Sequence, residues 1–167
     1  MPRMSTVAAT TAAMVLLAVP ARADAGRTAS QRAEQKMTAA INSVRARNNL
    51  PAFRRSASLT GSAERYSRRL MEKDWFGHQS SIQASSEFKL LGEALEMHTG
   101  RRFEVWPTIR RWLGAPSHRA ILLSPVMRRQ GAGVSRGRFG RSRAVVWVLH
   151  VGRLTLPGPG LPNVSLP

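Results

Sequence analysis

The sequence predicts an α+β fold, an α-β-α sandwich in which a small antiparallel sheet lies between helical layers. Three segments, at about residues 30–48, 57–74 and 107–113, place apolar side chains at helical spacing. Two further segments, 131–135 and 144–151, have the pattern of paired strands, and the second is almost entirely apolar. Such a strand is covered on both faces, which requires helices on both sides of the sheet. A chain of 167 residues with 43% hydrophobic residues is long enough for one domain with a sizeable core.

The predicted helices have recognisable buried stripes and ends. The first is expected to end at Asn48-Asn49, because asparagine tolerates the left-handed conformation that a helix end needs. Pro107 suits the first position of the third helix, and we expect Trp106 and Trp112 to be anchors in the core. The buried stripes of the first two helices are predicted to be Ala33, Met37, Ala40, Ile41 and Val44, and then Leu59, Ala63, Tyr66, Leu70 and Met71.

Polar and glycine-containing stretches between these segments are predicted to be loops. Residues 79–86 are expected to form a loop and residues 98–102 a polar turn. Residues 136–143 contain two glycines and are expected to form the hairpin loop that joins the two strands.

The two ends of the chain are predicted to lie outside the folded domain. Residues 1–23 have the positive charge, short apolar run and small-x-small ending of a cleaved export signal, with an uncleaved anchor as the alternative. Residues 24–32 are expected to be a linker and residues 33–152 the domain. Residues 153–167 are expected to be a disordered, proline-rich tail. The chain is therefore predicted to be secreted, to an extracellular or periplasmic location, with no transmembrane segment after cleavage.

The composition narrows the classes of function. The chain has no cysteine, so disulfides and thiolate chemistry are excluded. Its formal net charge of +17 favours polyanions such as anionic lipid or a cell-envelope polymer. The alternative is a general use of arginine over the whole surface. Nucleic acid is not expected as the primary partner, because export separates the protein from it and only one tyrosine is available for stacking on bases.

Five short motifs occur in an order that resembles a known family. The chain resembles the bacterial, SCP-like extracellular branch of the CAP superfamily, which includes cysteine-rich secretory proteins, antigen 5 and the pathogenesis-related 1 proteins. The resemblance covers about residues 33–152 and implies the α-β-α sandwich of that family. The motifs are Ile41-Asn42-x-x-Arg45, Phe76-x-His78, Gly92-Glu93, Trp112 followed by Ser117-His118-Arg119, and Gly131-x-Gly133-Val134.

The resemblance implies a cleft lined by His78, Glu93 and His118, and in some family members the matching residues bind a divalent cation such as zinc. Two imidazoles and a carboxylate are suitable zinc ligands. A second acidic residue, found in many relatives outside bacteria three positions after the helix-three tryptophan, is replaced here by Ala115. We therefore expect at most a weak site for Zn²⁺, with His78, His118 and Glu93 as its ligands.

Three other polar residues are expected to have no part in catalysis or binding. Ser117 is expected to cap the helical turn after Pro116, and a role as nucleophile is disfavoured because adjacent residues rarely align a hydroxyl with an imidazole. His150 is expected to be a strand histidine satisfied by hydrogen bonds, and His98 to lie in solvent.

The favoured function is that of a non-enzymatic, monomeric binding module. Its ligand would be a small apolar molecule or a cell-envelope polyanion, and its cleft would hold the weak cation site. The alternative is a metal-dependent hydrolase, a protease or nuclease, in which Glu93 acts as general base or ligand.

Overall fold

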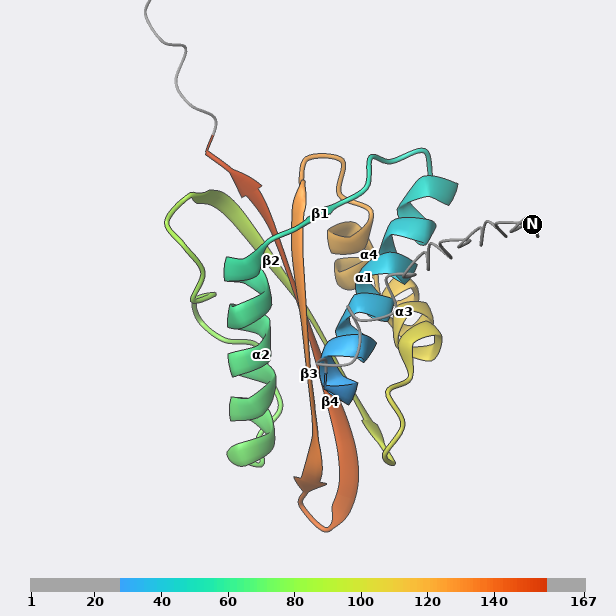
Figure 1. Ribbon diagram of the computed structural model, residues 1–167, viewed down its shortest axis with the longest axis vertical. Helices are drawn as coiled ribbons and strands as arrows, with labels where there is room; N and C mark the ends of the chain where they lie inside the picture. The colour runs from blue at the N-terminus through green and yellow to red at the C-terminus, as the bar shows by residue number, and fades with distance from the viewer. Residues whose placement is uncertain (1–27, 156–167) are drawn as a thin grey trace, which may run out of the picture.

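The computed structural model describes residues 28–155, which form a four-stranded sheet with helices on both faces (Figure 1). The strand order is β1-β3-β4-β2, with β4 in the interior and β2 at one edge. The elements in chain order are α1 (Ala29–Arg47), β1 (Arg54–Arg55), α2 (Ala57–Glu72), β2 (Phe88–Thr99), α3 (Val105–Gly114), α4 (Pro116–Leu122), β3 (Arg129–Phe139) and β4 (Ser142–Leu154).

Two hydrophobic clusters, one on each face of the sheet, hold the layers together. Helix α2 covers one face, where Tyr66 and Leu70 pack against Val146 and Val148 of β4. Helices α1, α3 and α4 cover the other face, where Met37 and Trp112 belong to the larger cluster. Every residue of β4 from Ala144 to Gly152 is buried. The prediction of a sheet between helical layers is therefore confirmed.

Helix α1 begins at Ala29, within one residue of its predicted start, so it is the predicted linker 24–32 that is too long. Thr28 caps it in a reciprocal arrangement with Gln31, in which each side chain accepts a hydrogen bond from the other residue's backbone N–H. The helix therefore includes residues 29–32, which the sequence had placed in a linker. Its predicted end is confirmed, because Asn48 caps it and Asn49 has a left-handed φ of 54°.

The sheet is larger than predicted, and it is mixed. Strand β2 extends to Thr99, into the predicted turn 98–102, and the two C-terminal strands extend over most of the predicted loop 136–143. The hairpin reverses in a tight turn at Gly140-Arg141, where Gly140 has a φ of 56°. The short strand β1 pairs with β3 in parallel, whereas all other pairs are antiparallel.

Three predictions at particular positions were wrong. Trp106 is 43% exposed and lies under the guanidinium of Arg47, whereas Trp112 is fully buried as predicted. Ser117 lies inside α4, because Ala115 occupies the cap position and the helix begins at Pro116. The tail predicted to start at residue 153 starts later, because β4 continues through Arg153 to Leu154.

Several expectations for the termini lie outside the part of the chain that the structure describes. These are the export signal at 1–23, the first part of the linker and the tail from residue 156 onward. Among the described residues, no helix combines the length and the apolar character needed to cross a membrane.

Candidate functional site

The structure brings His78, Glu93 and His118 together from three different segments. His78 lies in the loop after α2, Glu93 lies in β2, and His118 lies in the first turn of α4. Strand β2 is at the edge of the sheet, so a loop from the α2 face and a helix from the other face can meet around it. The Nδ1 atom of His78 lies 2.7 Å from Oε1 of Glu93, and the rings of His78 and His118 are 6.1 Å apart between centroids.

Glu93 is the centre of this group. Its side chain is almost fully buried, yet both carboxylate oxygens have partners. Oε1 faces His78, while Oε2 accepts a hydrogen bond from Nε2 of Gln79 at 2.6 Å and lies 2.9 Å from Nε2 of His150. Burial by itself would raise the pKa of Glu93, but the hydrogen bonds from His150, Gln79 and His78 outweigh it and hold this pKa below its ordinary value. The carboxylate is therefore ionised at neutral pH.

Sequence reasoning missed Gln79 and His150 as members of this site. His150 lies directly opposite Glu93 in the β2–β4 ladder, so their side chains project from the same face of the sheet. Because an ionised carboxylate can only accept, Nε2 of His150 must carry a hydrogen, whereas its buried Nδ1 has no partner. The expectation of a strand histidine held by hydrogen bonds is confirmed at one nitrogen only. The signal that could have identified His150 is the register of β2 against β4.

His118 differs from the other two histidines in its surroundings. Its ring is half-buried, and burial together with the neighbouring His78 lowers its pKa, while Glu96 acts in the opposite direction. The imidazole is therefore neutral at neutral pH, which is the form that binds metal ions. His78 is more open, with a side chain that is 58% exposed.

Among the described residues, Glu93 is the one carboxylate that forms an ion pair within this group. Ala115, three positions after Trp112, has no carboxylate to offer. Glu96, which acts on the pKa of His118, forms an ion pair with Arg111. Within residues 28–155, no three histidine, aspartate or glutamate side chains are already arranged to hold a metal ion.

Two residues of the first motif, Asn42 and Arg45, have a structural role. The side chain of Asn42 exchanges two hydrogen bonds with the backbone of Phe53, at 2.9 and 3.0 Å. Arg45 is fully buried and donates to the carbonyl oxygens of Pro51, Leu122 and Ser124. Since Leu122 ends α4, Arg45 fixes the helix that carries His118.

These features of fold and sequence define a class of protein. The sequence model of the cysteine-rich secretory protein family, the CAP family, matches residues 38–151. The chain therefore belongs to the CAP family, as the five motifs indicated. No curated protein sequence matches it significantly. Members of this family are typically secreted.

Solved structures of other CAP proteins have the same fold. An outer surface protein of Borrelia burgdorferi superposes with a TM-score of 0.63 and 19% identity, over 75% of this chain and 95% of that one. An extracellular, SCP-domain protein of Bacillus anthracis gives 0.62 and 20%, over 74% of this chain but only 41% of its own length. Venom allergen-like protein 4 of Schistosoma mansoni gives 0.57 and 10%, over 77% and 91% of the two chains. At these identities the likeness concerns the fold alone.

Proposed function

We propose that this CAP protein works outside the cytoplasm as a non-enzymatic binding module whose His78–His118 pair holds a divalent cation, zinc in particular. The observation that supports the cation site is the contact between an ionised Glu93 and Nδ1 of His78, beside the neutral ring of His118. Export is supported by the fact that members of the CAP family are typically secreted, and by the resemblance of residues 1–23 to an export signal.

The proposed roles of the three residues follow from their hydrogen bonds. Because Glu93 occupies Nδ1 of His78, the Nε2 atom of that ring is left to bind an ion. A carboxylate that orients a metal-binding histidine in this way is a common arrangement around zinc. Glu93 would thus hold His78 in place rather than bind the ion directly, and water would complete the coordination. Two protein ligands imply modest affinity.

The same contacts favour binding over catalysis. A general base needs an oxygen within reach of the water that it deprotonates, and its pKa should lie near the working pH. Both oxygens of Glu93 are already hydrogen-bonded, and its pKa is lowered rather than raised. The metal-dependent hydrolase is therefore the less favoured alternative.

For the partner, we propose an anionic polymer of the cell envelope rather than a small apolar molecule. The formal charge of +17 attracts polyanions at long range. Two of the surface hollows among the described residues have more basic than acidic side chains in their lining: one beside α2, and one between Arg101, Arg136 and Arg143. Polyanion binding through this surface would be independent of the cation.

Calorimetric titration of the purified protein with zinc tests the cation site. We expect uptake of one ion per chain at micromolar zinc, and loss of this uptake in a variant with His78→Ala and His118→Ala. His98→Ala is the matched control, because His98 lies elsewhere and is bonded to the carbonyl of Arg102. Absence of uptake, or equal uptake after both substitutions, would reject the site.

Two further measurements distinguish the proposed binding module from the metal-dependent hydrolase. Binding to an anionic polymer should survive the double histidine substitution, since it depends on the arginine-rich surface. Zinc-dependent hydrolysis of protein or nucleic acid that disappears with Glu93→Gln would instead favour the hydrolase.

A further inference from the structure

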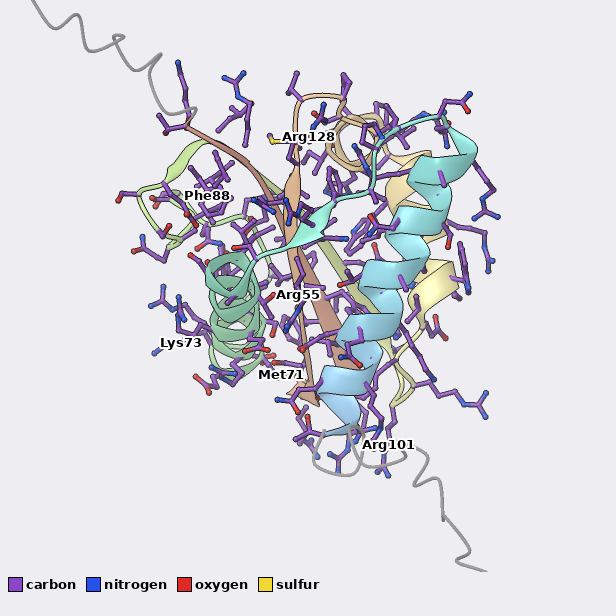
Figure 2. All side chains as sticks on the ribbon, turned by 45° about the horizontal axis from the view of Figure 1, so that its top comes forward. Arg55, Met71, Lys73, Phe88, Arg101 and Arg128 are labelled. Atoms are coloured by element: carbon purple, nitrogen blue, oxygen red, sulfur yellow. The ribbon has the colours of Figure 1, made fainter. Side chains whose placement is uncertain are left out.

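A hollow beside α2 adjoins the histidine cluster and shares Gln79 with it. It has a volume of about 240 Å³ and lies between α2 and the loop that follows it. Its lining includes Ser62, Arg65, Arg69, Lys73, Gln79 and Gln83. In Figure 2, Lys73, which follows the end of α2, points away from the body of the protein, whereas Met71 in the last turn of α2 lies on the inner side, toward the sheet.

The hollow carries an excess of positive charge. Four cationic side chains line it, Arg65, Arg68 and Arg69 of α2 and the cap residue Lys73, against one carboxylate, Glu72. None of these four cations forms an ion pair with another described residue. Arg65 is held at the rim by a hydrogen bond of 3.2 Å to the carbonyl of Gln83. An anion in this hollow would therefore meet several cations that have no competing carboxylate partner.

A buried hydroxyl in the same lining has no partner. The side chain of Ser62 is 2% exposed, and its Oγ makes no hydrogen bond to any described residue. Buried polar atoms are nearly always hydrogen-bonded, and an exception calls for an explanation such as a missing ligand. A ligand oxygen in the hollow would supply the absent partner.

We propose that this hollow binds a phosphate group. Phosphate presents several acceptor oxygens with high charge density, and the planar guanidinium of arginine binds two of them at once. Arg65, Arg69 and Lys73 would neutralise the group, and the hydroxyl of Ser62 would donate to one oxygen. This inference rests on the proposed polyanion partner and names the place where one phosphate of such a ligand binds.

A second basic hollow provides a matched comparison. Arg101, Arg136 and Arg143 line it, and Figure 2 shows Arg101 well apart from Lys73. The guanidinium of Arg136 is already engaged, since it donates to the carbonyl of Arg101 and lies over the ring of Phe103. No buried hydroxyl without a partner lines that hollow among the described residues. It therefore matches the charge of the α2 hollow without its hydroxyl.

NMR titration with inorganic phosphate tests the proposal, at constant ionic strength and without zinc. We expect saturable shifts in the backbone amides of α2 around Ser62 and Arg65. Arg65→Gln with Arg69→Gln should weaken binding about tenfold or more, the loss expected for two charge-assisted hydrogen bonds. Ser62→Ala should weaken it roughly threefold to tenfold, within the range for one hydrogen bond, and leave the fold intact. Arg101→Gln with Arg143→Gln should change it by less than about twofold.

The control variant, Arg101→Gln with Arg143→Gln, distinguishes a specific phosphate site from a diffuse basic surface. If the Arg101 and Arg143 substitutions weaken phosphate binding as much as those at Arg65 and Arg69, the pocket is rejected. It is also rejected if Ser62→Ala leaves the affinity unchanged, or if phosphate causes no saturable shift in α2. Any of these results leaves polyanion binding through the general surface intact, so the failure of the pocket is distinguishable from that of the proposed function.

The origin of the phosphate is resolved with vesicles. Binding to vesicles of phosphatidylcholine with phosphatidylglycerol, but not of phosphatidylcholine alone, would assign the group to a lipid headgroup if Arg65→Gln with Arg69→Gln abolishes it. Binding of free phosphate without vesicle binding would assign it to a soluble or polymer-borne ligand. Both results require the same two arginines.

Discussion

Arg45 is a charged residue that serves as part of the core. Its guanidinium lies 3.6 Å above the ring centroid of Phe53 and binds three carbonyl oxygens. Burial, with a smaller contribution from Arg128, lowers its pKa to about 10, so it stays charged at neutral pH. The carbonyls at the end of α4 thereby gain the donors that a helix C-terminus lacks. The position of His118 thus depends on a residue in a different helix.

Glu34 is a buried carboxyl group outside the candidate site. It lies in α1, and its Oε1 accepts a hydrogen bond of 3.0 Å from the backbone of Val134 in β3. Burial raises its pKa to about 7, and Glu64 of α2 adds to this rise, while the bond from Val134 and the charge of Arg55 oppose it. The folded protein therefore binds a proton at Glu34 more strongly than the unfolded chain does.

The first prediction concerns this proton. Because the pKa of Glu34 is higher in the folded state, its contribution to stability is complete below about pH 4.5 and is lost as the pH rises through about 7. A shift of this size corresponds to roughly 3 kcal/mol. Glu34→Gln keeps an acceptor for Val134 and has no proton to lose. It should remove most of this pH dependence and raise the free energy of unfolding at pH 8.

Urea denaturation across this pH range measures the effect. Glu87→Gln is the control, since it removes one carboxylate from an exposed loop position. If Glu34→Gln follows the same pH profile as the unsubstituted protein, the buried carboxyl is not the group that titrates.

At this scale the sequence identifies the site only in part. His78, Glu93 and His118 could be found because each stands in a family motif. His150 and Gln79 could not, because their contact with Glu93 depends on strand register and on the course of a loop. The exposure of Trp106 could not be predicted either, because helical spacing does not indicate how far the neighbouring layer of the fold extends.

Among the elements, the close packing of α2 on β3 depends on two glycines. A Cβ at Gly131 would lie 2.1 Å from the backbone nitrogen of Thr60, and one at Gly133 would lie 2.3 Å from the backbone of Ala63. Both contacts involve backbone atoms of α2, and these atoms cannot move unless the whole helix moves. The Gly-x-Gly-Val motif therefore sets the distance between a helix and the sheet.

The second prediction follows from this packing. Gly133→Ala should destabilise the fold by several kcal/mol, on the scale of about 3 or more, because the helix must move away from the strand. Gly114→Ala is the matched control, since its Cβ would meet no atom within 4 Å at the end of α3. That change should be neutral or stabilise by up to about 1 kcal/mol. Thermal unfolding of both variants compares them, and equal stabilities would disprove the packing argument.

Some helices and strands could be predicted from the sequence, and others could not. The three main helices and the β3–β4 pairing could be read from periodicity. Strand β2 could not, because its outer residues, such as Lys89 and Leu90, are exposed and its buried part contains a charged Glu93. Strand β1 pairs through only two residues, Arg54 and Arg55, and both are exposed. Neither strand has the alternation that a sequence pattern needs.

On the scale of the whole molecule, the histidine cluster and the basic hollow lie on the same side of the sheet, because Glu93 and His150 project toward α2. The histidine cluster surrounds the edge strand β2, where the two helical layers approach each other. The basic hollow lies beside α2, and Gln79 connects the two because it lines the hollow and bonds to Glu93. A ligand in the hollow would therefore lie beside the group that orients His78.

The last prediction concerns the net charge. A chain with a formal charge of +17 repels itself in the compact state, and salt screens this repulsion. The screening length falls from about 30 Å at 0.01 M to about 10 Å at 0.1 M salt. The temperature of unfolding should therefore rise as sodium chloride is increased over this range. A constant or falling temperature would mean that ion pairs, rather than repulsion, dominate the surface.

The same experiment with phosphate in place of chloride separates screening from site binding. Screening depends on ionic strength alone, so it should act equally on the protein with Arg101→Gln and Arg143→Gln and on that with Arg65→Gln and Arg69→Gln. A phosphate ion bound in the hollow beside α2 would add stabilisation that grows with its concentration. That extra rise in unfolding temperature should be absent from the Arg65 and Arg69 variant alone, because both pairs remove the same charge and only one removes the pocket.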